Sequence, residues 1–118
     1  MRITYELDTT LDPVRVYLGL HGPILAFHID EIGETFPLKD ALLEALAECK
    51  AALADERNLY QRTVWCLYSE PLCEDTLVIA IVGNNVRLAC AARSWCDLDV
   101  PAQAFVDFVE FVEIICRE

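Results

Sequence analysis

The chain has 118 residues, of which 55% are hydrophobic, and its 20 acidic and 9 basic side chains give a formal net charge of −11. This length and apolar content exclude a disordered chain and predict a single domain over residues 1–118. The negative charge excludes the basic footprint of nucleic-acid-binding proteins and any attraction to anionic membranes. It favours a basic protein as the partner.

No segment indicates a membrane span or a secretion signal. The longest apolar run, residues 77–82, is far too short to cross a bilayer. Residues 1–10 lack a charged region followed by an apolar one, as a signal peptide would have. We therefore expect a cytoplasmic protein that is a monomer or a homodimer.

The first half of the chain predicts three strands and a helix. Alternating apolar residues and a Gly–Pro turn at 22–23 predict strands over residues 2–7, 14–20 and 24–29. After a loop over 30–34, Thr35 or Phe36 is expected to cap a helix that has Pro37 in its first turn. Apolar residues then recur every three or four positions, which predicts a helix running to about residue 57.

The second half repeats this order. Three further strands are predicted, over residues 63–68, 76–82 and 86–92. The strand at 76–82 is almost entirely apolar, so we expect it to be a central strand buried on both faces. The turn at 83–85 contains Gly and Asn, which tolerate positive φ. Loops are expected over 70–75 and 94–99, and the second leads to Pro101 and a closing helix.

The closing segment, residues 102–118, pairs apolar residues with single acids at a period of three. On a helical wheel this pattern places the aromatic residues on one broad apolar arc and spreads the acids into a slanted stripe on the other side. A strand would leave no polar face, so we predict a helix that docks on a sheet. Val106 and Ile114 fall within the acidic arc and are expected at the surface.

The order βββα-βββα predicts an α+β fold, with an antiparallel sheet of five to six strands and two helices packed on one face. The likeness of the two halves has two interpretations. It is either an internal duplication or the common way of covering one face of a sheet with two helices. Poor residue identity between the halves favours the second interpretation.

Acidic residues recur on the outer faces of both predicted helices. Like charges four residues apart, such as Asp40–Glu44 and Glu44–Glu48, weaken a helix by a few tenths of a kcal/mol. The acids form either an ordinary solvated surface or a recognition face. On the second interpretation the partner-binding residues are Asp40, Glu44, Glu48, Asp55, Asp107, Glu110, Glu113 and Ile114. Charge reversal of Glu110 and Glu113 is then predicted to abolish binding and to leave the fold intact.

The sequence gives no sign of catalysis, a metal or a cofactor. His21 and His28 have no nucleophile motif to serve, and the four glycines are scattered singly rather than in a phosphate-binding loop. The six cysteines form no C-x-x-C pair, so we interpret most of them as small buried residues. Cys73 and Cys96 are expected in loops, where a redox-sensing role remains an alternative. We therefore expect a non-enzymatic binding protein.

The stretch VIAIVGNNVRLACAARSWCDLDVPAQAFVDFVEFVE, residues 78–113, combines a hairpin with an acidic closing helix. In this ending, in size and in acidity the chain resembles bacterial immunity proteins. The resemblance implies an acidic face that blocks a basic toxin. Phage anti-CRISPR proteins, some of which imitate DNA, are similar in the same respects. Type III secretion chaperones are also small, acidic and α+β, but they begin with a helix, whereas this chain begins with strands.

Overall fold

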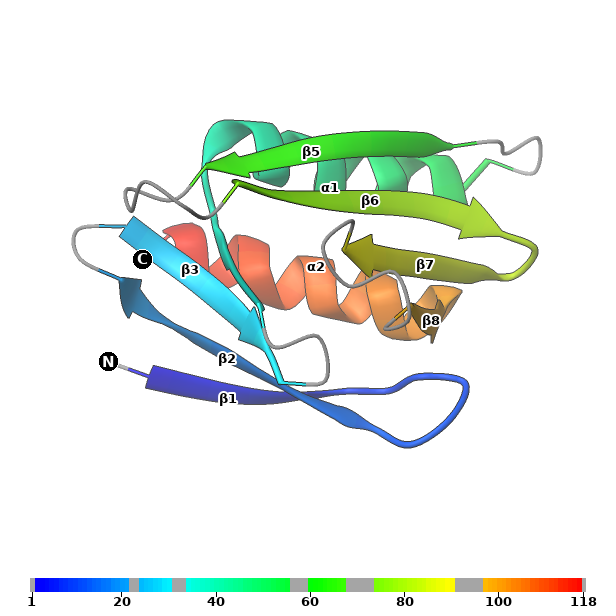
Figure 1. Ribbon diagram of the computed structural model, residues 1–118. Helices are drawn as coiled ribbons and strands as arrows, with labels where there is room; N and C mark the ends of the chain where they lie inside the picture. The colour runs from blue at the N-terminus through cyan, green and yellow to red at the C-terminus, as the bar shows by residue number, and fades with distance from the viewer. Residues whose placement is uncertain are drawn as a thin grey trace.

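The computed structural model describes residues 2–21, 24–30, 34–55, 60–67, 74–90 and 97–117 (Figure 1). Each half of the chain forms four strands followed by one helix. The elements are β1 (Arg2–Leu7), β2 (Val14–His21), β3 (Ile24–Ile29), β4 (Glu34–Pro37), α1 (Asp40–Leu53), β5 (Gln61–Leu67), β6 (Glu74–Val82), β7 (Asn85–Cys90), β8 (Leu98–Pro101) and α2 (Ala102–Arg117).

The strands form two antiparallel sheets of four, β1-β2-β3-β4 and β5-β6-β7-β8. The predicted α+β class is confirmed, but the single sheet of five to six strands is wrong. Within each sheet every strand pairs with its sequence neighbour, as consecutive antiparallel strands usually do. The turn between β6 and β7 has Gly83 at φ 63°, a conformation that glycine adopts without steric cost.

The two strands that the sequence did not predict, β4 and β8, each end in a proline. Pro37 pairs with Ala26 of β3, and Pro101 pairs with Asn85 of β7. Both prolines were expected in the first turn of a helix, and both instead lie at the last position of a strand. Proline is tolerated there because the residue is at the end of the hydrogen-bonded ladder. The backbone N–H groups of the next residues resume bonding: Leu38 donates to the Leu25 carbonyl at 2.8 Å.

Helix α1 is shorter at both ends than predicted. Thr35 and Phe36 belong to β4, and the N-cap is Lys39, which has an extended backbone conformation. The helix ends at Leu53, so Asp55 lies beyond it rather than on its flank. Helix α2 covers Ala102–Arg117, in agreement with the predicted closing helix.

Both helices pack on one face of the second sheet, α1 over β5 and β6 and α2 over β7 and β8. Helix α2 also faces β1 of the first sheet, where the Tyr5 ring stacks on Phe111 with a centroid separation of 4.8 Å. Its Phe108 ring lies 5.8 Å from Phe27 of β3. Helix α2 therefore lies between the two sheets (Figure 1).

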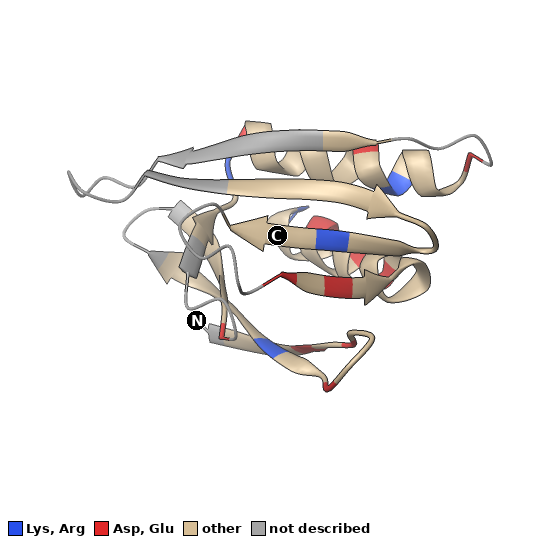
Figure 2. Ribbon diagram, turned by 45° about the vertical axis from the view of Figure 1, so that its right-hand side comes forward, with Lys and Arg blue, Asp and Glu red and all other residues tan. Residues whose placement is uncertain are grey.

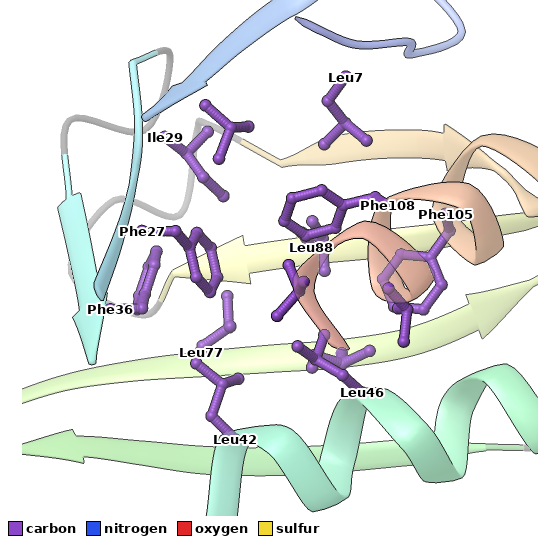
Figure 3. Close-up of a cluster of buried hydrophobic side chains, with 14 of the residues drawn as sticks. Leu7, Phe27, Ile29, Phe36, Leu42, Leu46, Leu77, Leu88, Phe105 and Phe108 are labelled. Carbon is purple, nitrogen blue, oxygen red and sulfur yellow. The ribbon is translucent and has the colours of Figure 1, made fainter. Parts of the chain in front are cut away.

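One hydrophobic cluster includes buried residues from both sheets and both helices. In Figure 3, Phe27 and Phe36 stand beside each other on the first sheet, and Phe108 lies towards Leu7 and Leu88. Phe27 and Phe36 are directly paired across β3 and β4, with their rings 5.3 Å apart. Such a shared core indicates that the two halves stabilise each other, because each one buries apolar surface of the other.

Strand β6 is central in its sheet, as predicted, but only one of its faces is fully buried. Leu77 and Ile79 point into the core and are 1% and 0% exposed. On the opposite face Val78 and Ala80 are half-buried, and Val82 at the strand end is exposed. The expectation of burial on both faces is therefore wrong, because the two helices cover the same side of this sheet.

Candidate functional site

A groove of about 340 Å³ lies between α1 and α2 and opens to solvent. Its floor consists of buried apolar side chains, Leu46, Val109 and Val112. Leu43 and Ala47, one turn apart on α1, form the more exposed wall on that side. The remaining lining residues are Glu44, Glu113, Cys116 and Arg117. The groove is thus apolar inside and has charged side chains at its rim, as ligand-binding surfaces commonly do.

The helical repeat explains why these residues meet. On α1 the stripe that includes Leu42, Leu46 and Cys49 faces the sheet, and Leu43 and Ala47 follow on the flank that faces α2. On α2 Val109, Val112 and Cys116 succeed one another at intervals of three and four residues. Because the side chains at Ala47 and Val112 are small, the two helices leave space between them at the surface.

Lys50 of α1 connects the two helices through ion pairs with α2. Its ammonium group lies 3.2 Å from the Glu113 carboxylate and 3.8 Å from that of Glu110. Glu113 also lies 3.9 Å from the Arg117 guanidinium, one turn later on α2. Two of the predicted partner-binding acids are thus engaged within the molecule. Reversing both to lysine would place four cations together, Lys50 and Arg117 among them, and would break this connection. The reversal predicted from the sequence would therefore also weaken the contact between α1 and α2.

The predicted acids of α1 face solvent. Asp40, Glu44 and Glu48 are exposed and follow one another at intervals of four residues, one helical turn each. Glu44 lines the groove, and Glu48 accepts a hydrogen bond of 3.3 Å from the Tyr60 hydroxyl. Asp55 is also exposed, after the end of the helix. In Figure 2 Asp and Glu, drawn in red, occur on both helices, together with fewer blue Lys and Arg residues.

The remaining predicted acid of α2, Asp107, is exposed and faces towards β1. It accepts a hydrogen bond of 2.9 Å from the Gln103 side chain. Burial of the Tyr5 ring, with the negative charges of Asp107 and Asp8, raises the pKa of the Tyr5 hydroxyl. Asp107 therefore belongs to a surface that continues towards the first sheet. Of the predicted acids, Glu44 and Glu113 line the groove, whereas Glu110 lies beside Lys50 and Asp107 lies outside the groove.

The exposed apolar residue predicted on α2 is present. Ile114 is 56% exposed. Val106, which was also expected at the surface, is half-buried. Of the cysteines, Cys49 and Cys90 are buried as predicted, but Cys116 is exposed at the groove. Burial raises the pKa of the Cys49 thiol to about 12. Cys73 and Cys96 lie outside the described residues.

Other polar clusters offer weaker chemistry. His28 of β3 stacks on Tyr17 of β2 at 6.3 Å and lies 3.8 Å from the Asp30 carboxylate, on the outer face of the first sheet. Among the described residues, no three His, Cys, Asp or Glu side chains are grouped so that they would hold a metal ion. None of the helices there is long and apolar enough to cross a membrane. The groove between the helices is therefore the strongest candidate site.

In comparisons with known proteins, no family model matches the chain, and no curated protein or solved structure matches it either. Function is therefore inferred from the geometry of the groove and its charges.

Sequence reasoning missed the residues that make the acidic face into a site. The contact of Lys50 with Glu113 joins positions 63 residues apart in the sequence. No local pattern indicates such a contact. The groove depends on how α1 packs against α2, which the sequence does not specify. The small side chain of Ala47 is compatible either with close contact between the helices or with a space between them.

Proposed function

We propose that the protein is a non-enzymatic inhibitor that binds a basic protein partner with the surface formed by α1 and α2. A bacterial toxin is the partner that we place first, so that the protein acts as an immunity protein. A CRISPR effector, inhibited by a DNA-like acidic surface, is the alternative. The two readings share one binding mode and differ in the identity of the partner.

The observation that carries this proposal is an apolar groove beside a row of exposed carboxylates. Interfaces are strong where an apolar centre is excluded from water and a charged rim surrounds it. Here the groove floor is apolar and Glu44 lies at its edge, with Asp40 one turn before Glu44 and Glu48 one turn after it on the exposed surface of α1. The net charge of −11 would accelerate association with a basic partner and make that association sensitive to salt.

The secretion-chaperone reading has less support. Chaperones of that class need a long apolar surface for an extended segment, and the groove between α1 and α2 has a volume of only about 340 Å³.

The proposal is tested by capture from lysate of the native host at low and high salt, with mass spectrometry of the eluted proteins. The matched variants are Asp40→Lys with Glu44→Lys, on the proposed surface, and Asp8→Lys with Asp12→Lys, in the exposed β1–β2 loop. Both pairs change the net charge equally. We expect a basic protein that salt releases, that the first pair loses and that the second pair keeps. Equal loss in both pairs would reduce the effect to net charge and contradict a specific surface.

A captured partner is then purified and assayed with and without the protein. Inhibition of a toxin activity supports the immunity reading, and inhibition of DNA binding or cleavage by a CRISPR effector supports the alternative. A partner whose activity is unchanged by stoichiometric binding would contradict the inhibitor proposal.

A further inference from the structure

We infer that the open edge of β1 is a contact between two copies of this chain, in which β1 of one copy pairs antiparallel with β1 of the other about Thr4. The two first sheets of four strands then form one continuous sheet of eight. This contact is separate from the surface of α1 and α2 and does not depend on the proposed function. Its grounds are an unpaired strand edge, a self-complementary sequence and the alternation of charges that the pairing produces.

Strand β1 has one edge open to pairing. It pairs with β2 alone, and none of the described backbone hydrogen bonds outside the helices and strands involves residues 2–7. In Figure 1 β1 lies along the lower border of the molecule. The open edge therefore presents backbone N–H and C=O groups of alternate residues that have no partner in the described part of the chain. Such an edge is a template for pairing with another strand.

The other sheet edges are less suited to this kind of contact. Strands β4 and β8 have four residues each and end in a proline, which has no N–H group to donate. Asp99 of β8 also accepts a backbone hydrogen bond of 2.9 Å from Thr10. Strand β5 has Arg62 as its one charged residue, so two copies of it would offer no opposite charges. Strand β1, by contrast, has six residues, no proline and one charge of each sign.

The sequence of β1, RITYEL, is self-complementary when two copies of it pair. Directly opposite residues of an antiparallel pair lie on the same face of the sheet. A pairing centred on Thr4 therefore sets Ile3 opposite Tyr5 on the inner face, where both pack against the core. On the outer face it sets the position of Arg2 opposite Glu6, and the two-fold symmetry repeats both pairs. Each copy thus offers the other an opposite charge and an apolar residue.

The pairing continues an alternation of charges that the first sheet already has. Glu6 lies opposite Arg15 in the β1–β2 register, and the Asp30 N–H donates to the Arg15 carbonyl at 3.0 Å. A hydrogen bond with Tyr17, and then the negative charges of Glu6 and Asp30, raise the pKa of the Arg15 guanidinium. Glu6 is exposed on the edge strand, so a cation of a second copy can approach it from the open side. The row across the joined sheets is then Asp30, Arg15, Glu6 and the second copy's Arg2. Such alternation matters because two copies of net charge −11 repel each other except where opposite charges meet.

The inference is tested with two charge reversals that are studied alone and mixed. Arg2→Glu leaves two acids on β1, and Glu6→Arg leaves two bases. In a homodimer of either variant, like charges would lie opposite each other twice. In the mixed dimer both pairs again have opposite signs. Self-association of the wild type, of each variant and of their equimolar mixture is measured by sedimentation velocity at about 0.15 M salt, where screening limits the repulsion of the net charges.

We expect the wild type to form a dimer, each variant alone to associate at least about tenfold more weakly, and the mixture to recover to within about threefold of the wild type. A change of net charge does not explain this pattern, because Arg2→Glu makes the chain more acidic and Glu6→Arg makes it less acidic. Loss of the fold does not explain it either, since mixing would not rescue an unfolded variant. Urea unfolding measures how far Glu6→Arg weakens the sheet through its position opposite Arg15.

A second measurement tests the register. Thr4→Cys places two thiols opposite each other at the centre of the proposed pairing, where Cβ atoms are about 5 Å apart. Thr10→Cys makes the same substitution at an exposed position after the end of β1, and Thr4 is exposed as well. Mild oxidation should give a covalent dimer of Thr4→Cys above the wild-type background on a non-reducing gel. Thr10→Cys should show no such increase.

Several results would overturn the inference. One is a wild type that stays monomeric at every accessible concentration. Another is a wild-type dimer that neither charge reversal weakens, because the contact would then lie elsewhere. Weakening by both variants without recovery in the mixture would overturn the proposed pairing, as would equal cross-linking of Thr4→Cys and Thr10→Cys. None of these results bears on the binding of a basic partner by α1 and α2, which the capture experiment tests separately.

Discussion

Removal of the Lys50 charge is expected to loosen the contact between α1 and α2 by a measurable amount. The ammonium group lies 3.2 Å from the Glu113 carboxylate, and the two side chains are 32% and 34% exposed. The substitution Lys50→Met keeps most of the aliphatic stem and removes the charge. It also leaves Glu110 and Glu113, three residues apart on α2, without the cation that separates their negative charges.

The magnitude follows from the distance and the partial burial. Two unit charges about 4 Å apart interact by about 1 kcal/mol in water and about 4 kcal/mol at an effective dielectric constant of about 20. Ordering a lysine side chain costs up to about 2 kcal/mol, and fully exposed pairs give 0.2–1 kcal/mol, so roughly 1 kcal/mol is expected to remain. The freed repulsion between the two glutamates adds a few tenths of a kcal/mol. We therefore expect Lys50→Met to lower the free energy of unfolding by about 1–1.5 kcal/mol.

The assay is a double-mutant cycle measured by urea unfolding. The four proteins are the wild type, Lys50→Met, Glu113→Gln and the double variant, and the expected coupling free energy is about 1 kcal/mol at low salt. High salt should reduce this coupling, because the pair is only partly shielded from solvent. The control is Lys39→Met, since Lys39 is exposed and forms no ion pair within the described part of the chain. A coupling below about 0.3 kcal/mol, with unchanged m-values, would refute this account of the helix contact.

Four further predictions concern the core, a turn and the thiols. Burial raises the pKa of Cys49 to about 12, so the native thiol stays protonated while that of the unfolded chain ionises above its ordinary value near 9. The free energy of unfolding should therefore fall between pH 9 and 12, by up to about 1.4 kcal/mol per pH unit, and Cys49→Ala should remove that part of the slope. Equal slopes in the two proteins would contradict this. Phe108 is 1% exposed, and its ring contacts those of Tyr5 and Phe27. Phe108→Ala should therefore lower the free energy of unfolding in urea by about 3–5 kcal/mol. A decrease of less than about 2 kcal/mol would show that the surrounding side chains fill the space. Gly83→Ala should lower the free energy of unfolding by about 1–2 kcal/mol because of the φ of 63° alone, since an added Cβ has no other atom within 4 Å. Gly83→Asn should lower it less, because Asn adopts positive φ more readily than Ala. Equal decreases for the two variants would contradict this explanation. Partial burial raises the pKa of the Cys116 thiol, so iodoacetamide should modify this residue more slowly than it modifies free cysteine, and faster as the pH rises. Cys90 is buried and should be protected. Peptide mass spectrometry that found Cys90 modified before Cys116 would contradict this prediction.

The elements with a strong periodic pattern could be predicted from the sequence. Strands β1 and β3 match their predicted bounds, and α2 begins at its predicted first residue. The two missed strands, β4 and β8, have only four residues each, too few for an alternating pattern to be recognised. Both end in proline, which in sequence also indicates the first turn of a helix. The sequence around each proline is therefore compatible with the end of a strand and with the first turn of a helix. Pairing with β3 and with β7 makes these residues strands.

The division into two sheets could not be predicted, because it depends on contacts between distant segments. Strands β4 and β5 lie near each other in space but belong to different sheets. The candidate site shows the same limit. The acidic residues are visible in the sequence as charges, whereas the contact of Lys50 with Glu113 and the space beside Ala47 arise only when α1 and α2 pack together.

The packing of α1 on β5 and β6 has a consequence for the order of events during synthesis. A ribosome releases the first four strands and α1 before the strands that cover Leu42 and Leu46 exist. The apolar side of α1 must then remain without its final cover until β5 and β6 have emerged. A fragment that stops before β5 is therefore expected to aggregate or to need a chaperone.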